Sequence, residues 1–207
     1  IFGEGFEGYK YKKGLTINAQ NSGTLGRLIL GLLVNTPKKL RLIGDKSLFQ
    51  RDFKRVSNPL SKFGVKFNLK NNINLPLTIL GSQYLRPIKY IENRGSAQCK
   101  SSVIFAGMRT EGTTFIKVKK SRNHTELMCK YLNLPISITK KKKFDLIKIK
   151  KAKKIKALNY NIPSDISSSA FFMVLTSLSE NSELKIKKVN VNPTRTGIIT
   201  ILKKMGI

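Results

Sequence analysis

The sequence contains one pattern three times: a short run of small polar residues is followed by an apolar run. The three runs begin at Ser22, Ser96 and Asp165, so the second and third starts follow at nearly equal intervals. Repetition at nearly constant spacing is typical of a repeated supersecondary unit, and it restricts the fold more strongly than composition does. Each start pairs a good N-cap residue with residues that suit a helix packed on a core. We therefore expect three repeats, each with a helix beginning at one of these positions.

Hydrophobic periodicity assigns the remaining elements of each repeat. Residues 1–20 are expected to form short strands or loop. The first repeat is predicted to contain a helix over 22–34, a strand over 39–43, a second helix from Ser47, and strands over 65–69 and 77–80. The second repeat is predicted to contain helices over 96–106 and 121–132 and strands over 114–118, 136–139 and 144–149. The third repeat is predicted to contain a helix over 165–178 and a strand over 183–189.

Details of the second helices support the repeat. Their starts near Ser47, Ser121 and Asn192 follow one another at nearly the same interval as the first helices do. Pro59 is expected to kink or divide the first of them. Asn123 and Glu126 have capping-box spacing, and Asn192 is predicted to cap the last helix, with Pro193 in its first turn. Each repeat thus has the order strand, helix, strand, helix, strand, strand, which indicates an α/β (α+β) fold.

The chain is strongly basic, with 40 Lys and Arg against 11 Asp and Glu and a net charge of +29. Such a charge favours anionic partners such as nucleic acid, an acidic membrane surface or phosphorylated metabolites. The alternative is compositional, because an A/T-rich genome enriches Lys, Asn and Ile together. The only dense run of lysines, over 140–143 and 148–156, is either a solvated hairpin or a nucleic-acid patch. Only Phe144 interleaves there as an aromatic residue, which weakens the second interpretation.

Other features exclude several classes of protein. Cys99 and Cys129 form no C-x-x-C pair and are expected to be buried thiols in a reducing cytosol, so we expect a cytoplasmic protein. The longest apolar run, 28–34, is too short to span a bilayer, and no signal peptide is visible. A single histidine and the lack of phosphate-loop, dinucleotide and H-E-x-x-H motifs argue against metal and nucleotide sites of those types. Because the chain begins at Ile1 and ends directly after a helix pattern, we expect a piece of a longer protein.

The residues that remain for chemistry lie at the helix starts, where small polar side chains stand next to Arg27, Arg51 and Arg122. The first turn of a helix offers free N–H groups and a partial positive charge to an anion. Arginine binds phosphate or carboxylate through two parallel hydrogen bonds. If these starts converge, they would bind a phosphorylated, carboxylated ligand. The alternative is that they are ordinary caps and surface arginines, so the residues alone indicate an anion-binding α/β repeat protein.

Six motifs, in order along nearly the whole chain, resemble those of the 5-enolpyruvylshikimate-3-phosphate synthase family. They are Asn21-Ser22-Gly23-Thr24 with Arg27, Leu42-Ile43-Gly44-Asp45-Lys46-Ser47 with Arg51, Gly95-Ser96-Ala97-Gln98-Cys99-Lys100-Ser101, Ser121-Arg122-Asn123-His124-Thr125-Glu126, Ile162-Pro163-Ser164-Asp165-Ile166-Ser167-Ser168 and Asn192-Pro193-Thr194-Arg195-Thr196-Gly197. The sequence departs from the family at Asp52, where Pro is usual, and at Ser164, where Gly is usual.

The resemblance implies a fold of six βαβαββ repeats, three in each of two domains, with helices packed inside and sheets outside. This chain would match the second, third and fourth repeats. Residues 1–160 would then hold two repeats of the first domain, and residues 161–207 the start of the second domain, with a hinge near 159–163.

The resemblance also implies a reaction, in which the enolpyruvyl group of phosphoenolpyruvate passes to the 5-hydroxyl of shikimate 3-phosphate and phosphate leaves, without metal or organic cofactor. Ser96, Ala97 and Gln98 would contact shikimate 3-phosphate, with Ser121 and Arg122 at its phosphate. Gly23 and Arg51 would face phosphoenolpyruvate, which Gln98 would also contact. Supporting positions would be Asn21, Ser22, Thr24 and Arg27.

In this family the acid/base residues belong to parts outside these motifs, so no catalytic residue is assigned here and the chain alone is predicted to be inactive. The intact enzyme is expected to be a monomer that binds neither nucleic acid nor membrane. One alternative is the related transferase acting on uridine diphosphate N-acetylglucosamine, which has a mobile-loop cysteine; neither Cys99 nor Cys129 is predicted to lie in such a loop. The other alternative is a basic nucleic-acid-binding repeat protein.

Overall fold

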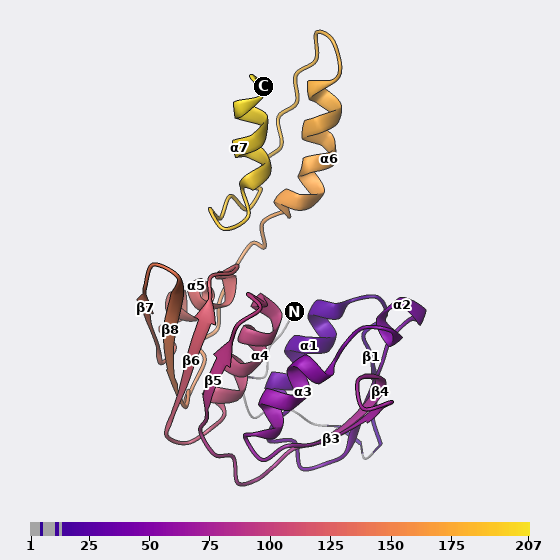
Figure 1. Cartoon of the computed structure of the whole chain (residues 1–207), viewed down its shortest axis with the longest axis vertical. Coiled ribbons are helices and arrows are strands. Elements are labelled where there is room, and N and C mark those ends of the chain that lie inside the picture. The colour runs from indigo at the N-terminus through magenta and orange to yellow at the C-terminus, as the bar shows by residue number, and fades with distance from the viewer. Residues whose placement is uncertain (1–4, 6–10, 13) are drawn as a thin grey trace. The chain divides into compact units, whose positions relative to one another are not determined.

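The computed structural model describes residue 5, residues 11–12 and residues 14–207. Contacts divide the chain into two bodies. Lobe 1 comprises Ile1–Ser121 and Thr125–Lys156, and lobe 2 comprises Arg122–His124 and Ala157–Ile207. Figure 1 labels most elements of both lobes. The domain boundary that the resemblance implies, between residues 160 and 161, stays a prediction.

The first repeat of lobe 1 forms a four-stranded sheet and three helices. Its elements are β1 (Thr16–Asn18), α1 (Gly23–Leu32), β2 (Leu40–Ile43), α2 (Lys46–Phe49), α3 (Lys54–Ser61), β3 (Lys66–Lys70) and β4 (Asn74–Leu80). The strand order is β1-β2-β4-β3, with β1 parallel to β2 and the other pairs antiparallel. We expected short strands or loop over residues 1–20, and the strand β1 lies there. Most of the other residues of this segment fall outside the described residues.

The second repeat has the same topology. Its elements are β5 (Lys89–Glu92), α4 (Ala97–Met108), β6 (Thr113–Lys119), α5 (His124–Tyr131), β7 (Ile136–Lys140) and β8 (Phe144–Lys150). The strand order is β5-β6-β8-β7, again with a parallel first pair and two antiparallel pairs. Two consecutive βαβαββ units with identical strand order confirm the repeat that the spacing predicts.

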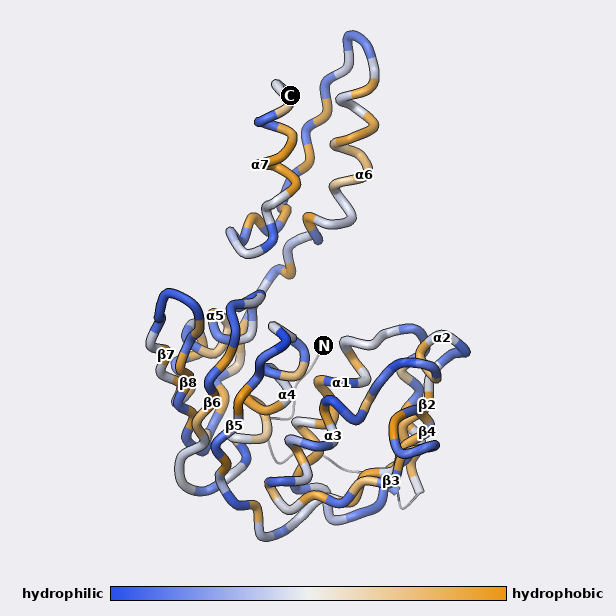
Figure 2. Tube along the Cα trace, in the orientation of Figure 1, coloured by the Kyte–Doolittle hydropathy of each residue, from blue (hydrophilic) through white to orange (hydrophobic). Residues whose placement is uncertain are grey.

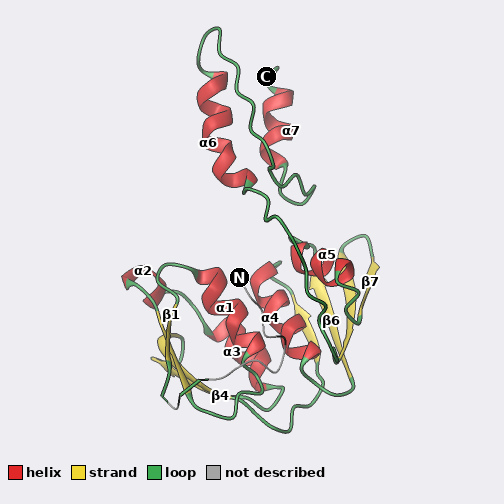
Figure 3. Cartoon of the chain, turned by 180° about the vertical axis from the view of Figure 1, so that it is seen from behind, coloured by secondary structure: helices red, strands yellow, loops and turns green. Residues whose placement is uncertain are grey.

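Three helices of lobe 1 lie between its two sheets. Figures 1 and 3, from opposite sides, both show α1, α3 and α4 between the sheet that contains β4 and the sheet that contains β6. Helix α1 packs on α4 so closely that a Cβ at Gly31 would lie 2.2 Å from the carbonyl oxygen of Ser102. Strands β6 and β8 alternate buried and exposed residues, as expected for sheets with one covered face. In lobe 1 these helices therefore lie inside and the two sheets lie outside, as the resemblance implies.

The second helices end alike in all three repeats, at Gly64, Asn133 and Gly206. These residues have φ values of +104°, +52° and +86°, a left-handed conformation that Gly and Asn adopt most readily. The shared conformation supports the repeat independently of the strands.

The interruption of the second helix in the first repeat is not at Pro59, as we expected, but at residues 50–53. Here the backbone N–H of Phe53 donates to the carbonyl of Ile73 (2.8 Å), and the side chain of Asp52 accepts from the N–H of Arg55 (3.2 Å), which starts α3. Pro59 lies inside α3, which ends two residues later. The bond to Ile73 is a tertiary contact, so local sequence could not reveal it.

Two predictions for lobe 2 are also wrong. No strand forms over 183–189 in the described chain, where only Val189 makes an isolated bridge to Ser164. A strand requires a continuous hydrogen-bonding partner, and this segment has one only at that point. The last helix, α7 (Gly197–Lys204), begins later than expected because the side chain of Asn192 accepts from the N–H of Thr194 and closes a turn instead.

Lobe 2 otherwise consists of α6 (Ile166–Ser177) and α7. Asp165 caps α6 as predicted, its side chain accepting from the N–H of Ser167 (3.2 Å). Figure 2 shows apolar colouring over much of both helices. Of the α6 residues only Ile166 and Ser169 are buried, so the main hydrophobic core of the described chain belongs to lobe 1.

The remaining predictions concern the cysteines, the lysine run and the membrane. Cys99 and Cys129 are free, buried thiols, as expected. Lys140 ends β7, residues 141–143 form the turn to β8, and Lys148 and Lys150 lie on β8, whereas residues 151–156 follow this strand outside the hairpin. The lysines of the run are exposed. Among the helices of the described residues, none has both the length and the apolar character required to cross a bilayer.

Candidate functional site

The start of α1 brings a buried glycine against two arginines. Ser22 is the N-cap, and its Oγ accepts from the N–H of Leu25 (3.1 Å). A Cβ at Gly23 would lie 3.0 Å from Nη1 of Arg51 and 3.3 Å from Nη1 of Arg27. Glycine thus leaves the space between the helix start and two guanidinium groups open, which suits a small anion.

Arg27 extends from α1 toward the second repeat. Its Nη1 donates to Oε1 of Gln98 (2.6 Å), and its Nη2 donates to the carbonyl of Asp52 (3.3 Å). Its guanidinium also lies over the ring of Phe53, 5.4 Å from the centroid. Burial lowers the pKa of Arg27 from its ordinary value, yet arginine stays charged at any physiological pH. Its Nε is buried without a hydrogen-bond partner among the described residues.

Gln98, in the first turn of α4, joins the two repeats. While its Oε1 accepts from Arg27, its Nε2 donates to Oγ1 of Thr24 in the first turn of α1 (2.8 Å). The starts of α1 and α4 therefore lie side by side, although 74 residues separate Thr24 from Gln98.

A second set of contacts orients Arg51. Its Nη2 donates to Oδ1 of Asn21 (3.5 Å), and Nδ2 of Asn21 donates to Oδ2 of Asp45 (2.5 Å). Asp45 also caps α2, accepting from the N–H of Leu48 (2.7 Å). The hydrogen bond from Asn21, followed by the one from Leu48, lowers the pKa of Asp45. We did not predict Asp45 as a site residue, although its place in the second motif is a usable signal.

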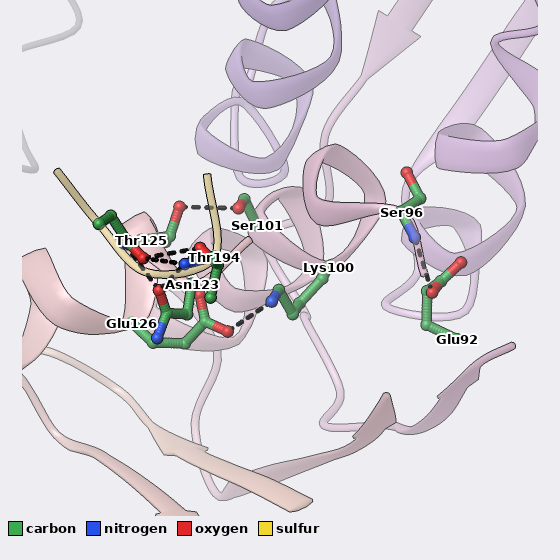
Figure 4. A network of polar contacts seen from close by, with 9 residues as sticks. Glu92, Ser96, Lys100, Ser101, Asn123, Thr125, Glu126 and Thr194 are labelled. Carbon is green, nitrogen blue, oxygen red and sulfur yellow. Dashed lines mark hydrogen bonds and ion pairs between the residues drawn. The ribbon is translucent and has the colours of Figure 1, made fainter. Parts of the chain in front are cut away.

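The start of α4 is shaped by residues before it. Gly95 has φ +72°, a conformation that favours glycine. Ser96 caps α4, its Oγ accepting from the N–H of Cys99 (3.3 Å), and Ala97 is the first residue of the helix. The N–H of Ser96 donates to the buried carboxylate of Glu92 (2.9 Å), a contact visible in Figure 4. Glu92 is a further residue that sequence reasoning missed.

The start of α5 is tied to α4 by two side-chain contacts, shown in Figure 4. The hydroxyls of Ser101 and Thr125 are 2.7 Å apart, and Nζ of Lys100 lies 2.6 Å from Oε1 of Glu126. The capping-box spacing of Asn123 and Glu126 is therefore not used as a capping box, because Glu126 pairs with Lys100.

Described contacts thus bring six predicted residues into one cluster: Asn21, Gly23, Thr24, Arg27, Arg51 and Gln98. Ser22, Ser96 and Ala97 belong to the two helix starts that form it. Ser121 is not joined to it by a described contact, but its Oγ is buried without a partner in the described part of the chain. Arg122 is exposed and belongs to lobe 2, so its place relative to the cluster is not defined.

The chemistry of the cluster is that of anion binding. It offers two guanidinium groups, an amide and two helix starts. Cys129 is no candidate nucleophile, because burial, and then the nearby carboxylate of Glu126, raise the pKa of its thiol to about 12. Within the described residues, no three His, Cys, Asp or Glu side chains group in a way that could hold a metal ion.

Comparison with known families decides the relationship. A family model described as "EPSP synthase (3-phosphoshikimate 1-carboxyvinyltransferase)" matches residues 3–207. The chain belongs to the EPSP synthase family. The proteins named 3-phosphoshikimate 1-carboxyvinyltransferase from Caldicellulosiruptor bescii and Leuconostoc mesenteroides are 44% identical over 192 residues and 41% identical over 207 residues. These alignments cover 92% and 100% of this chain.

A solved EPSP synthase from Acinetobacter baumannii has the same fold. It superposes with a TM-score of 0.81 at 34% identity over 97% of this chain. The chain spans less than half the length of the relatives it matches, at 44% of the Caldicellulosiruptor protein, 46% of the Leuconostoc protein and 44% of the solved structure. The resemblance inferred from the six motifs is confirmed, and family membership favours it over the two alternative functions.

Proposed function

We propose that the complete protein carrying this chain transfers the enolpyruvyl group of phosphoenolpyruvate to the 5-hydroxyl of shikimate 3-phosphate and releases phosphate. The observation that carries the proposal is the convergence of the α1 and α4 starts on Arg27, Arg51 and Gln98. Both substrates are anions, and the reaction requires them to be held together. Placing them in one preorganised polar site lowers the entropic cost of bringing them together and stabilises charge in the transition state.

Each half of the site receives one substrate in this proposal. Gly23 and Arg51, on the first repeat, bind phosphoenolpyruvate. Ser96, Ala97 and Gln98, on the second repeat, bind shikimate 3-phosphate, and Ser121 and Arg122 bind its phosphate. Gln98 also contacts phosphoenolpyruvate. The hydroxyl of Ser121 supports this role, because it is buried and has no hydrogen-bond partner among the described residues, and a buried donor is costly unless something accepts its hydrogen bond. Asn21, Ser22, Thr24 and Arg27 support the site; no metal or organic cofactor takes part.

The organisation of the complete protein is part of the proposal. Residues 1–160 belong to a first domain and residues 161–207 begin a second, with a hinge at 159–163. The acid/base groups come from outside this chain, which alone turns over no substrate. The complete enzyme acts in the cytoplasm as a monomer, without nucleic-acid or membrane partners.

The test is phosphate release by the complete protein given both substrates. We expect product with the unmodified protein, and a loss of at least about tenfold in kcat/KM for Gln98→Ala, because Gln98 contacts both repeats. Gln83→Ala, an exposed glutamine away from the cluster, is the matched control and should keep full activity. A complete, folded protein that releases no phosphate would refute the proposal, and so would equal activity of the Gln98 and Gln83 variants.

A further inference from the structure

Lys100 and Glu126 form an ion pair inside lobe 1. Their side chains are 1% and 5% exposed, and Nζ of Lys100 lies 2.6 Å from Oε1 of Glu126. Removing two charges from water is expensive, and the mutual attraction repays the cost only with good geometry and further hydrogen bonds. Here the second carboxylate oxygen of Glu126 is buried without a hydrogen-bond partner among the described residues. Stability alone is therefore a weak explanation for this pair.

The fold itself does not require an ion pair at this place. The shift along the chain that carries Ser22 onto Ser96 also carries Gly26 of the first repeat onto Lys100. At Gly26 the space is filled by the ring of Phe53, which lies 3.2 Å from where a Cβ of Gly26 would be. An apolar filling thus serves the same scaffold in the other repeat.

The pair instead connects two segments of the proposed site. Lys100 is in the first turns of α4, three residues after Ala97, and Glu126 is in the first turn of α5, five residues after Ser121. The neighbouring residues form a second link, the 2.7 Å contact between the hydroxyls of Ser101 and Thr125. Figure 4 shows both links running between α4 and α5. Two adjacent directional contacts fix how the helices are rotated and shifted along each other.

Lys100 also changes the charge near these helix starts. A carboxylate in the first turn of α5 would repel an anion bound there, and the ammonium of Lys100 offsets it. Losing Lys100 would leave an unpaired buried carboxylate close to the place proposed for a phosphate. Geometry and charge therefore predict an effect on the same ligand.

We propose that Lys100 and Glu126, assisted by Ser101 and Thr125, are positioning residues that hold the starts of α4 and α5 at the separation required by shikimate 3-phosphate. This inference rests on the function proposed above. These four residues are assigned to shikimate 3-phosphate alone, because Gly23 and Arg51 on the first repeat make none of these contacts.

The experiment measures shikimate 3-phosphate binding to the complete protein by calorimetry, beside its thermal unfolding midpoint. The variants are Glu126→Gln, Lys100→Met and the apolar double variant Lys100→Met/Glu126→Leu. The control is Glu111→Gln, which breaks the exposed ion pair of Glu111 with Lys151. We expect both single variants to lower the midpoint, because each removes one partner of a buried ion pair, and to weaken shikimate 3-phosphate binding at least about tenfold.

The double variant separates positioning from stability. It should recover the unfolding midpoint, since no buried charge is left, yet still bind shikimate 3-phosphate at least about tenfold more weakly, because apolar chains give no directional contact. The KM for phosphoenolpyruvate, measured with saturating shikimate 3-phosphate, should change less than about twofold. Binding at the unmodified level by the folded double variant would overturn the inference, as would an equal loss in the control.

Two further outcomes are distinguishable. Should the double variant not fold, Thr125→Val removes the hydroxyl contact between α4 and α5 in a folded protein. This variant should weaken shikimate 3-phosphate binding about threefold, and unchanged binding would count against the inference. An unmodified complete protein that neither binds shikimate 3-phosphate nor forms product would instead refute the proposed function.

Discussion

The two repeats of lobe 1 share a strand order and differ in what lies beneath their first helices. In the first repeat the ring of Phe53 packs at Gly26, and Arg27 extends over that ring to Gln98. In the second repeat the place of Gly26 is taken by Lys100, which turns inward to Glu126. The cationic side chain on α1 thus reaches the other repeat, whereas the one on α4 is buried against α5.

This difference gives the two halves of the cluster different chemistry. The first repeat contributes two guanidinium groups beside a glycine, which suits a small, highly charged anion. The second repeat contributes a hydroxyl, an amide and backbone N–H groups at the start of α4, which suit a ligand with hydroxyls as well as charge. The two repeats therefore present different polar groups at their helix starts, although they share one strand order.

The largest effect is expected where the repeats meet, at Gly31. A Cβ there would lie 2.2 Å from the carbonyl oxygen of Ser102, so α1 and α4 would have to move apart. Gly31→Ala should cost about 3 kcal/mol of unfolding free energy, measured by denaturant titration of the complete protein. Gly197→Ala is the control and should be close to neutral, because no atom of the described residues lies within 4 Å of the added Cβ. Equal costs at both positions would mean that the helix crossing is not tightly packed.

Gly23→Ala tests whether the first repeat binds phosphoenolpyruvate and the second binds shikimate 3-phosphate. The added methyl would meet the guanidinium groups of Arg51 and Arg27 at 3.0 and 3.3 Å and narrow the space between them. We expect the KM for phosphoenolpyruvate to rise about tenfold, or about 1.4 kcal/mol, with the KM for shikimate 3-phosphate little changed. The apparent affinity of glycine-phosphonate mimics of phosphoenolpyruvate should fall in parallel.

The matched change in the second repeat is Ala97→Gly, since Ala97 follows the cap Ser96 as Gly23 follows the cap Ser22. It alters the start of α4 without touching the two arginines, so the KM for phosphoenolpyruvate should stay within about twofold. If Ala97→Gly and Gly23→Ala affected the same substrate, the assignment of one substrate to each repeat would be wrong.

A smaller effect is expected at Gly26, where the first repeat has its apolar filling. A Cβ would lie 3.2 Å from the ring of Phe53, so the ring must shift by a few tenths of an ångström. Gly26→Ala should cost about 1 kcal/mol, and Phe53→Leu should remove that penalty. A double-mutant cycle on the unfolding free energy measures this coupling; additive effects would contradict the packing described here.

Sequence patterns predicted those elements whose causes are local. The caps at Ser22, Ser96 and Asp165 depend on residues within a few positions of each other. For Gly23, Arg51 and Gln98, the residues alone left open whether the helix starts converge, and the family resemblance placed them at one site.

What could not be predicted depends on distant partners. The break before α3 is set by the bond between Phe53 and Ile73, and the segment 183–189 stays irregular where no continuous partner strand pairs with it. Lys100 and Glu126 were both visible within motifs, but only the packing of α4 on α5 reveals that they pair. Asp45 was likewise visible within the second motif, but its hydrogen bond to Asn21 spans 24 residues and only the structure reveals it.

The smallest expected effect concerns the hydrogen bond between Asn21 and Asp45, which is specific to the first repeat. Asp45 accepts from Nδ2 of Asn21, which lowers the pKa of its carboxyl below the ordinary 3.8, whereas the second repeat has Lys119 at the equivalent position. A carboxyl with a lowered folded-state pKa adds stability above its unfolded pKa, and this contribution disappears as pH falls through the folded pKa. Asn21→Ala should therefore raise the pKa of Asp45 toward its ordinary value, so that protonation and loosening of the α2 cap begin at a higher pH.

Carbon-detected NMR titration of the Asp45 carboxyl in the complete protein measures this shift, with Asn68→Ala on the exposed face of β3 as the control. The shift should be partial, because the N–H of Leu48 still donates to Asp45 in the variant. An unchanged pKa would mean that the cap alone holds Asp45 ionised and that Asn21 is free to serve Arg51 only. A raised pKa accompanied by weaker phosphoenolpyruvate binding would instead show that the chain from Asp45 through Asn21 orients Arg51, a device that the second repeat, with lysine at this position, does not share.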